Sequence, residues 1–285
     1  MSKMAAFAYV LALATATNAA ATEKTASGQM LFALQTAGAP IEISKLPAAK
    51  EYAKLDSVLA SASIDWAAVM TTIREIDAAN DSVNEELSKR VLDIVDPERK
   101  IEAWYDMYNI TWASPLLEYA AGDESDEKPV YETVNGELRD KKPDSKKTRE
   151  WVKSMRQAMQ RLPRVEGVSF RGTRLQPARI DEYYKAKAPT TEASFLSTSV
   201  EPGVGFRFAH PRIDEAAGRN PKDRLAVVFI VYGKSGRPVS TFAGMHNHEQ
   251  EVLFPNGTPF TVTHMSPVIQ DAELGPTRVI VMTEN

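Results

Sequence analysis

Three short segments in the second half of the sequence contain residue types that could bind an anion and stabilise a cation. In the first segment, Arg171 follows Phe170 in a strand-like pattern and precedes Gly172. A guanidinium in a partly buried strand needs an anionic partner, and its planar shape suits phosphate or carboxylate oxygens. The glycine beside it would let a ligand approach the backbone closely. Taken alone, the pair also fits an ordinary surface arginine.

Hydroxyl side chains follow one another in the second segment, Phe195-Leu196-Ser197-Thr198-Ser199. Ser197 and Ser199 fall on one face of the expected strand, and Thr198 falls on the other. Hydroxyls on a strand face can bind a ligand or hold a carboxylate in position. Solvated serines on an edge strand are the alternative.

Two carboxylates form the third segment, because Glu249 and Glu251 stand two residues apart before the apolar run Val252-Leu253-Phe254. In an extended backbone the two side chains would share a face. Their repulsion then makes the arrangement costly, unless a cationic group or a cationic transition state lies between them. The alternative is a pair of solvated glutamates at a strand end.

The order and spacing of the three segments resemble the Arg-Ser-Glu class of mono-ADP-ribosyltransferases. That class includes bacterial toxins, phage enzymes that modify host proteins, and vertebrate ectoenzymes. The resemblance covers residues 145–285 and does not extend to residues 1–144. It implies an α+β catalytic domain with a mixed or antiparallel β-sandwich, NAD as co-substrate, and no metal.

The resemblance also implies which residues bind NAD. Arg171 would bind a phosphate of the dinucleotide, with the Gly172 backbone beside the nicotinamide amide. Ser197 would hydrogen-bond both the catalytic glutamate and the nicotinamide ribose. Thr198 and Ser199 would belong to the same NAD-binding strand.

The two glutamates would have different roles. Glu251 would bind the 2′-hydroxyl of the nicotinamide ribose and stabilise the oxocarbenium character that develops as nicotinamide leaves. Glu249 would orient or deprotonate the acceptor. In the family a glutamate at this position accompanies arginine as acceptor, and a guanidinium needs a carboxylate partner. Related toxins often carry an aromatic residue three positions earlier, where this chain has His246, a candidate for substrate recognition.

The resemblance predicts transfer of ADP-ribose to arginine on a host or target-cell protein, by a toxin or effector of bacterial or phage origin. A dedicated immunity protein is then expected as a further partner. The alternatives are an NAD glycohydrolase with water as acceptor, transfer to nucleic acid, and a binding module without turnover. Retained Glu249 favours transfer, and intact Arg171, Ser197 and Glu251 argue against lost turnover. His248 is not part of a His-Glu-x-x-His pattern, which disfavours a metal site.

The elements that would position these residues begin with a helix. Apolar spacing from Asp144 to Leu162 predicts it, with Asp144 or Ser145 as N-cap and Pro163 ending it. Short apolar runs separated by turns then predict strands at Gly167–Leu175, Ser194–Val200, Leu225–Tyr232, Glu249–Phe254, Phe260–His264 and Thr277–Thr283. The run Leu225–Val231 is apolar at both parities, which is typical of a strand that is buried on both faces.

Residues 1–144 are expected to form a helical N-terminal region. One apolar face begins at Trp66 and another at Val83, where a capping box starts a helix that ends before Pro97. An acidic linker is expected at about 120–144, with a strand-like patch at Val130–Val134 in a surface hairpin or linker. The catalytic domain would follow over residues 145–285.

The composition is that of a globular protein, with 43% hydrophobic and 25% charged residues and a net charge of −4. This balance disfavours a nucleic-acid-binding surface. The sequence has no cysteine, which excludes disulfides and thiolate chemistry. No transmembrane segment is predicted, but Lys3 and the apolar run after it resemble a secretory signal at about 1–20. An Ala-rich helix packed on the protein is the alternative, so the chain is expected either to be exported or injected, or to be a soluble intracellular protein.

Overall fold

The computed structural model describes residues 39–45, 49–80, 83–95, 110–120, 130–140, 145–242 and 249–285. The predicted signal at about 1–20 and the predicted substrate contact His246 therefore lie outside the described residues. Residues Ala37–Asn285 form one compact unit. In the described part of this unit no helix is long and apolar enough to cross a membrane.

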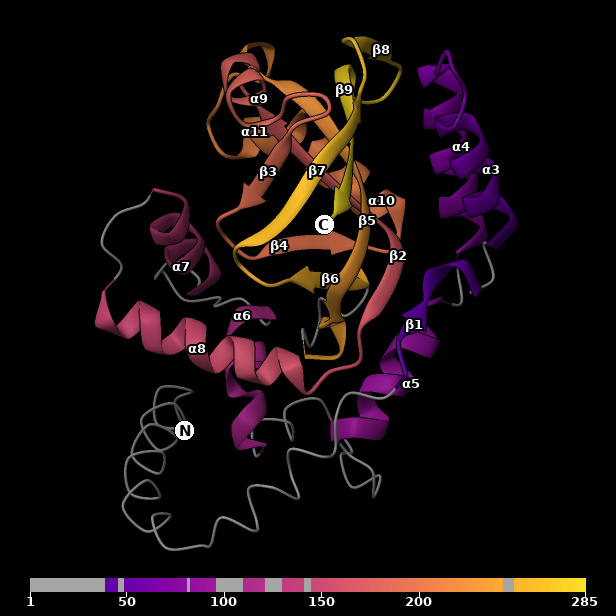
Figure 1. The fold of residues 1–285 in the computed structure, drawn as a ribbon. Helices are drawn as coiled ribbons and strands as arrows, with labels where there is room; N and C mark the ends of the chain where they lie inside the picture. The colour runs from indigo at the N-terminus through magenta and orange to yellow at the C-terminus, as the bar shows by residue number, and fades with distance from the viewer. Residues whose placement is uncertain are drawn as a thin grey trace, which may run out of the picture. The chain divides into compact units, whose positions relative to one another are not determined.

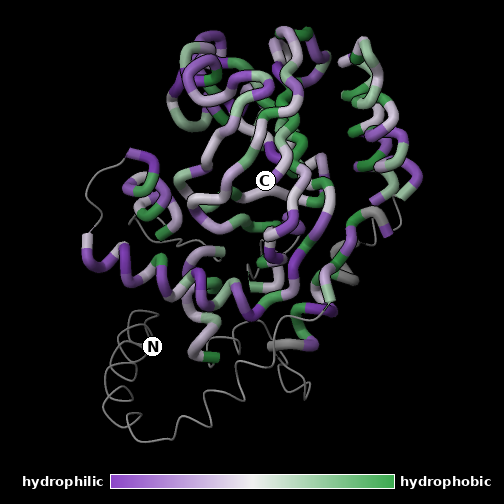
Figure 2. The backbone as a smooth tube through the Cα atoms, viewed as in Figure 1, coloured by the Kyte–Doolittle hydropathy of each residue, from purple (hydrophilic) through white to green (hydrophobic). Residues whose placement is uncertain are grey.

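Helices occur both before and within the strand-rich half of the described chain (Figure 1). They are α3 (Ala49–Leu59), α4 (Trp66–Ala79), α5 (Val83–Val95), α6 (Ser114–Ala120), α7 (Val130–Arg139), α8 (Lys146–Gln160), α9 (Pro177–Tyr183), α10 (Pro202–Ala209) and α11 (Arg212–Ala216). The predicted helix from Asp144 is confirmed as α8, because the Ser145 hydroxyl caps it by accepting from the Thr148 N–H. Figure 2 shows α8 as mostly hydrophilic with hydrophobic positions recurring along it, and its buried residues Met155, Ala158 and Met159 are spaced as on one face of an amphipathic helix.

The described strands are joined by hydrogen bonds in the order β1-β2-β4-β6-β5-β9-β7-β3, with β8 on β9 and a further pairing of β2 with β5. Their bounds are β1 (Ile41–Glu42), β2 (Val165–Leu175), β3 (Pro189–Glu192), β4 (Leu196–Ser199), β5 (Leu225–Pro238), β6 (Glu251–Phe254), β7 (Thr258–Met265), β8 (Ile269–Asp271) and β9 (Gly275–Glu284). Pairs β1–β2 and β5–β9 are parallel and the others are antiparallel. The predicted α+β class with a mixed sheet is confirmed.

Strand β5 lies at the centre of this arrangement and pairs with β2, β6 and β9. Its segment Val227–Val231 is almost fully buried, as the apolar run at both parities predicted. The sequence did not predict β1, β3 and β8. These strands have two to four residues, which are too few to show a period of two.

Helices α3 and α4 pack their apolar faces into the same hydrophobic cluster as β2 and β5. Asp65 caps α4, and the predicted face of this helix is buried at Val69 and Ile73. Two polar links add to the contact. Arg74 on α4 binds both carboxylate oxygens of Asp271 at 2.8–2.9 Å, and the Gly203 N–H at the start of α10 donates to Asp77.

The prediction of a strand-like patch in a hairpin or linker at Val130–Val134 is wrong, because these residues begin helix α7. Val130, Val134 and Leu138 are spaced at i, i+4 and i+8. They pack against a second hydrophobic cluster that contains α6, α8 and β6 residues. Burial of this helical face outweighs the β preference of the valines, which is a weak local preference.

Gly172 on β2 lies against α10. A Cβ atom at Gly172 would stand 1.6 Å from the carbonyl oxygen of Gly205 and 3.1 Å from the Cβ of Ala209. Only a hydrogen atom fits between this strand and this helix. Close packing of α10 therefore explains the glycine, and the predicted contact of its backbone with a ligand remains a prediction.

Substitution Gly172→Ala should destabilise the fold by about 3 kcal/mol or more, because the backbone carbonyl of Gly205 cannot move away cheaply. Urea unfolding measures this change. Gly136→Ala is the matched control, since no atom lies within 4 Å of the added Cβ in helix α7. The control should gain about 0.5–1 kcal/mol from reduced backbone entropy. Equal stability of the two variants would contradict the packing argument.

Candidate active site

Strands β2, β4 and β6 bring the three predicted segments side by side. Phe170 on β2 pairs with Ser199 on β4, and Ser199 pairs in turn with Glu251 on β6. Arg171, Ser197 and Glu251, which are up to 80 positions apart in the sequence, thus belong to adjacent strands. The sheet, and not local sequence, assembles the constellation.

The Arg171 guanidinium is half-buried and is held along one edge. Its Nη1 donates to the backbone carbonyl of Ser197 at 2.7 Å. Within the described part of the chain, its Nε and Nη2 groups have no hydrogen-bond partner. These N–H groups therefore remain available to bind an anion such as a phosphate.

The Glu251 side chain is buried at 8% exposure. Its backbone N–H donates to the Ser240 hydroxyl, which fixes the first residue of β6. Burial raises the pKa of the carboxyl to about 7. The Ser197 hydrogen bond and the Arg171 charge lower this pKa, and the Glu249 charge raises it. The site thus contains a carboxylate that is costly to ionise unless further positive charge approaches it.

The prediction that Glu249 and Glu251 share the face of an extended strand is wrong. Strand β6 begins only at Glu251, and Glu249 lies in a 3₁₀ turn. Gln250 between them has a φ of 45°, in the left-handed region. The turn is held at Glu249, whose backbone carbonyl accepts from the Ser199 hydroxyl at 2.7 Å, and the Glu249 charge raises the pKa of Glu251.

The hydroxyls of Ser199 and Thr198 hold the backbone around the glutamates. Ser199 Oγ donates to the carbonyl of Glu249 at 2.7 Å and accepts from the Glu201 N–H at 2.9 Å. Thr198 Oγ1 donates to the carbonyl of Val252 at 2.8 Å. Both side chains are nearly buried and are used within the protein, so their predicted contact with NAD remains a prediction.

Residues from helices α6 and α7 border the site, and no motif in the sequence marked them. The buried Asn135 of α7 accepts from the Phe195 N–H through Oδ1 and donates to the Tyr119 hydroxyl through Nδ2, both at 3.1 Å. Burial raises the pKa of Tyr119, and the Glu251 charge raises it further. The i, i+4 spacing of Tyr131 and Asn135 could have indicated a common helical face.

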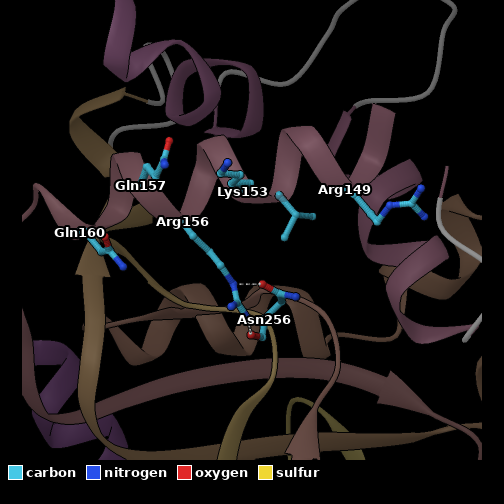
Figure 3. A pocket seen from close by; sticks show the side chains of 7 residues that line it. Arg149, Lys153, Arg156, Gln157, Gln160 and Asn256 are labelled. Carbon is cyan, nitrogen blue, oxygen red and sulfur yellow. Dashed lines mark hydrogen bonds between the residues drawn. The ribbon is translucent and has the colours of Figure 1, made fainter. Parts of the chain in front are cut away.

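A hollow of about 520 Å³ lies elsewhere, between α8 and the turn after β6 (Figure 3). It is lined by Arg149, Val152, Lys153, Arg156, Gln157, Gln160 and Asn256. Arg156 closes part of it by donating from Nε to Asn256 Oδ1 at 2.8 Å. None of the predicted site residues lines this hollow, and the Arg171–Ser197–Glu251 constellation is the better candidate because Ser197 is linked to both Arg171 and Glu251. The described residues contain no His, Cys, Asp or Glu cluster that could hold a metal ion.

The fold is that of ADP-ribosyltransferases. The ADP-ribosyltransferase Vis of Vibrio splendidus is 17% identical and superposes with a TM-score of 0.52 over 81% of this chain and 90% of that chain. The ADP-ribosyltransferase HopU1 of Pseudomonas syringae pv. tomato DC3000 is 20% identical, with a TM-score of 0.50 over 72% of this chain and 87% of that chain. The chain therefore has the ADP-ribosyltransferase fold.

Sequence comparison gives particular relatives. The chain is 35% identical over 135 residues to a protein of Mycobacterium avium (strain 104) named NAD(+)–arginine ADP-ribosyltransferase Mav. The match covers 47% of this chain and 14% of that protein. It is 27% identical over 175 residues to the NAD(+)–protein-arginine ADP-ribosyltransferase Tre1 of Pseudomonas putida (strain GB-1). This match covers 61% of this chain and 29% of that protein.

The chain thus spans less than a third of the length of the curated relatives that it matches. No family model matches the sequence. The resemblance that the motifs indicated is confirmed in sequence and in fold.

The raised pKa of Glu251 predicts how stability depends on pH. The folded state holds a proton at Glu251 up to about pH 7, whereas an unfolded glutamate loses it near 4.5. Stability from this group is therefore present below pH 4.5 and is lost as pH rises through 7. The Glu251→Gln variant lacks this loss. Its free energy of unfolding relative to wild type should therefore rise by about 3 kcal/mol between pH 4.5 and pH 8. Chemical unfolding of both proteins at pH 4.5 and 8 measures the difference, and equal gaps at the two pH values would contradict the assignment.

Proposed function

We propose that this protein is an NAD-dependent mono-ADP-ribosyltransferase that modifies arginine side chains on a protein. The observation that carries the proposal is the buried Glu251 carboxyl, which is held by Ser197 next to Arg171. A carboxylate in such surroundings is stabilising above all when a cation forms beside it. Cleavage of the nicotinamide–ribose bond produces such a cation. The ADP-ribosyltransferase fold supports the same reaction.

The residues present fit the substrate and the steps of the reaction. Arg171 offers a phosphate of NAD the Nε and Nη2 groups that have no partner among the described residues. The bond between ribose C1′ and the nicotinamide nitrogen breaks, and its electron pair leaves with neutral nicotinamide. The Glu251 charge stabilises the resulting oxocarbenium character. A guanidino nitrogen of the acceptor then bonds to C1′, and the proton that it loses passes to Glu249 or to water.

Arginine is the proposed acceptor because Glu249 can pair with a guanidinium. The names of Mav and Tre1 support this choice, since both specify arginine. The proposal includes a toxin or effector role for a chain that leaves the producing cell. Its further partners would be a protein of a host or target cell, as acceptor, and an immunity protein in the producing cell.

The first test is cleavage of NAD itself. Purified protein should release nicotinamide from NAD, measured by fluorescence of an etheno-NAD analogue. The Glu251→Gln variant should be slower by about 10²–10³-fold, because a preorganised charge at the reacting centre is lost. Glu150→Gln on the exposed face of α8 should match wild type. A wild-type protein without turnover would refute the proposed activity.

The pH profile of the same reaction gives a second test. Glu251 acts as a carboxylate, and its pKa in the free protein is raised to about 7. The kcat/KM for NAD should therefore fall about tenfold for each pH unit below 7, since this ratio reports ionisations of the free enzyme. A profile that stays flat down to pH 5 would show that Glu251 ionises normally or does not take part.

The third test separates transfer from hydrolysis. With labelled NAD and either agmatine or a cell lysate, wild type should label the acceptor. In Glu249→Gln the rate of acceptor labelling should fall at least tenfold, while the variant still releases nicotinamide, because only the pairing with the guanidinium is removed. Parallel digestion with protease and RNase identifies the labelled macromolecule. Label that RNase removes would contradict the arginine assignment.

A further inference from the structure

Side chains of α3 and of the α4 C-cap hold the backbone that follows the serine motif. Val200 comes directly after Ser199, and its carbonyl accepts from Asn80 Nδ2 at 2.7 Å and from the Tyr52 hydroxyl at 3.4 Å. Asn80 Nδ2 also donates to the Tyr52 hydroxyl at 3.3 Å. Both side chains are almost fully buried. Two residues from before position 145 thus bind one carbonyl next to the site.

The same stretch of backbone holds the turn that precedes β6. The Val200 N–H donates to the Gln250 carbonyl at 3.3 Å, and the Ser199 hydroxyl donates to the Glu249 carbonyl at 2.7 Å. Gln250 Nε2 donates to the Glu201 carboxylate at 3.1 Å. Among the described residues, every hydrogen bond of this turn is made with residues 199–201. Val200 therefore joins the turn to α3 and α4 through its own N–H and carbonyl.

Glu251 is held by additional bonds that do not involve Val200. Its N–H donates to the Ser240 hydroxyl, and its carbonyl accepts from the Val239 N–H at 3.0 Å. Val239 and Ser240 follow strand β5 directly, so they fix Glu251 from the centre of the sheet. A change at Val200 should therefore displace Glu249 more than Glu251.

Asn80 is a costly residue for the position that it occupies. Its Oδ1 atom is buried and has no hydrogen-bond partner among the described residues. A buried polar atom without a partner destabilises the folded state, and an apolar side chain would not carry this cost. The donor function of the Asn80 amide toward Val200 explains the residue better than stability does.

We propose that Asn80 is a positioning residue for the acceptor, because through Val200 it fixes the turn that carries Glu249. This inference rests on the proposed function, in which Glu249 binds the acceptor guanidinium. A group that orients a reactant must be held in a defined geometry, since small misplacements slow the reaction strongly. Helices α3 and α4, which precede the recognisable motifs, thereby take part in transfer, whereas NAD cleavage by Glu251 does not require Asn80.

The experiment compares transfer to agmatine with nicotinamide release from NAD alone in Asn80→Leu. Leucine keeps the branched shape but removes the donor to Val200, so kcat/KM for agmatine should fall on the order of 10-fold. Nicotinamide release should stay within about twofold of wild type, since Glu251 keeps its own bonds. Thr72→Val is the matched control. It removes a buried hydroxyl that donates within α4, to the Ala68 carbonyl, and should leave both rates unchanged.

Two further variants separate positioning from a general loss of structure. In the Glu249→Gln background, Asn80→Leu should lower transfer by less than about twofold more, because Asn80 acts through Glu249. Tyr52→Phe keeps the buried ring and removes the more distant donor, so it should show the same selective loss, on the order of 3-fold. Tyr52→Phe decides the question by itself if Asn80→Leu does not fold.

The outcomes distinguish the inference from the proposed function. Unchanged transfer in the folded variants would overturn the inference and leave the proposed function standing. An equal loss of transfer and of nicotinamide release would assign Asn80 to the fold or to the NAD site, and would also overturn it. A full additional loss in the Glu249→Gln background would show that Asn80 does not act through Glu249, with the same consequence. A wild-type protein that releases no nicotinamide would refute the proposed function, and the inference with it.

Discussion

The arrangement of the site depends on the burial of the Glu251 carboxyl. A buried carboxylate is costly, and the structure offsets only part of this cost through the Ser197 hydrogen bond and the Arg171 charge. Both of these groups come from other strands, so the carboxylate is positioned only when β2, β4 and β6 are assembled. The remaining cost disfavours the ionised ground state and favours any state in which positive charge appears beside Glu251. A fold that keeps this carboxyl dry thereby prepares the site for a cationic transition state.

Helices that pack on the strands from two sides keep the Glu251 carboxyl buried. On one side α10 packs so closely on β2 that Gly172 can carry no side chain. On the other side α6, α7 and α8 enclose the aromatic cluster of Tyr119, Trp151 and Phe195, which adjoins the strand that carries Ser197. The second group includes helices that precede residue 145, so part of the chain outside the recognisable motifs borders the site. The predicted domain boundary at residue 144 stays a prediction.

The two glutamates illustrate how a residue assignment can rest on a local geometry that the structure contradicts. Their spacing in the sequence indicated a shared strand face, whereas Gln250 takes a left-handed conformation and the strand starts only at Glu251. The turn gives the two carboxylates different surroundings: Glu251 is buried beside Ser197, and Glu249 precedes the strand, where its carbonyl accepts from the Ser199 hydroxyl. Such a separation suits two roles, one toward the ribose and one toward the acceptor.

The sequence by itself determined the elements whose signal is local. The amphipathic stripe and the Ser145 cap fixed α8, the apolar run at both parities fixed β5 as a buried strand, and the order of the three motifs indicated the family and the residues Arg171, Ser197 and Glu251. Only the tertiary structure decided the rest. The valines of α7 became helical because one face could be buried against α6 and β6, and Asn135 reached the backbone of Phe195 because helix packing placed it there. Contacts between residues far apart in the chain have no period or spacing to detect, so the neighbours of Glu251 that lie outside the motifs became visible only once the strands and helices were in place.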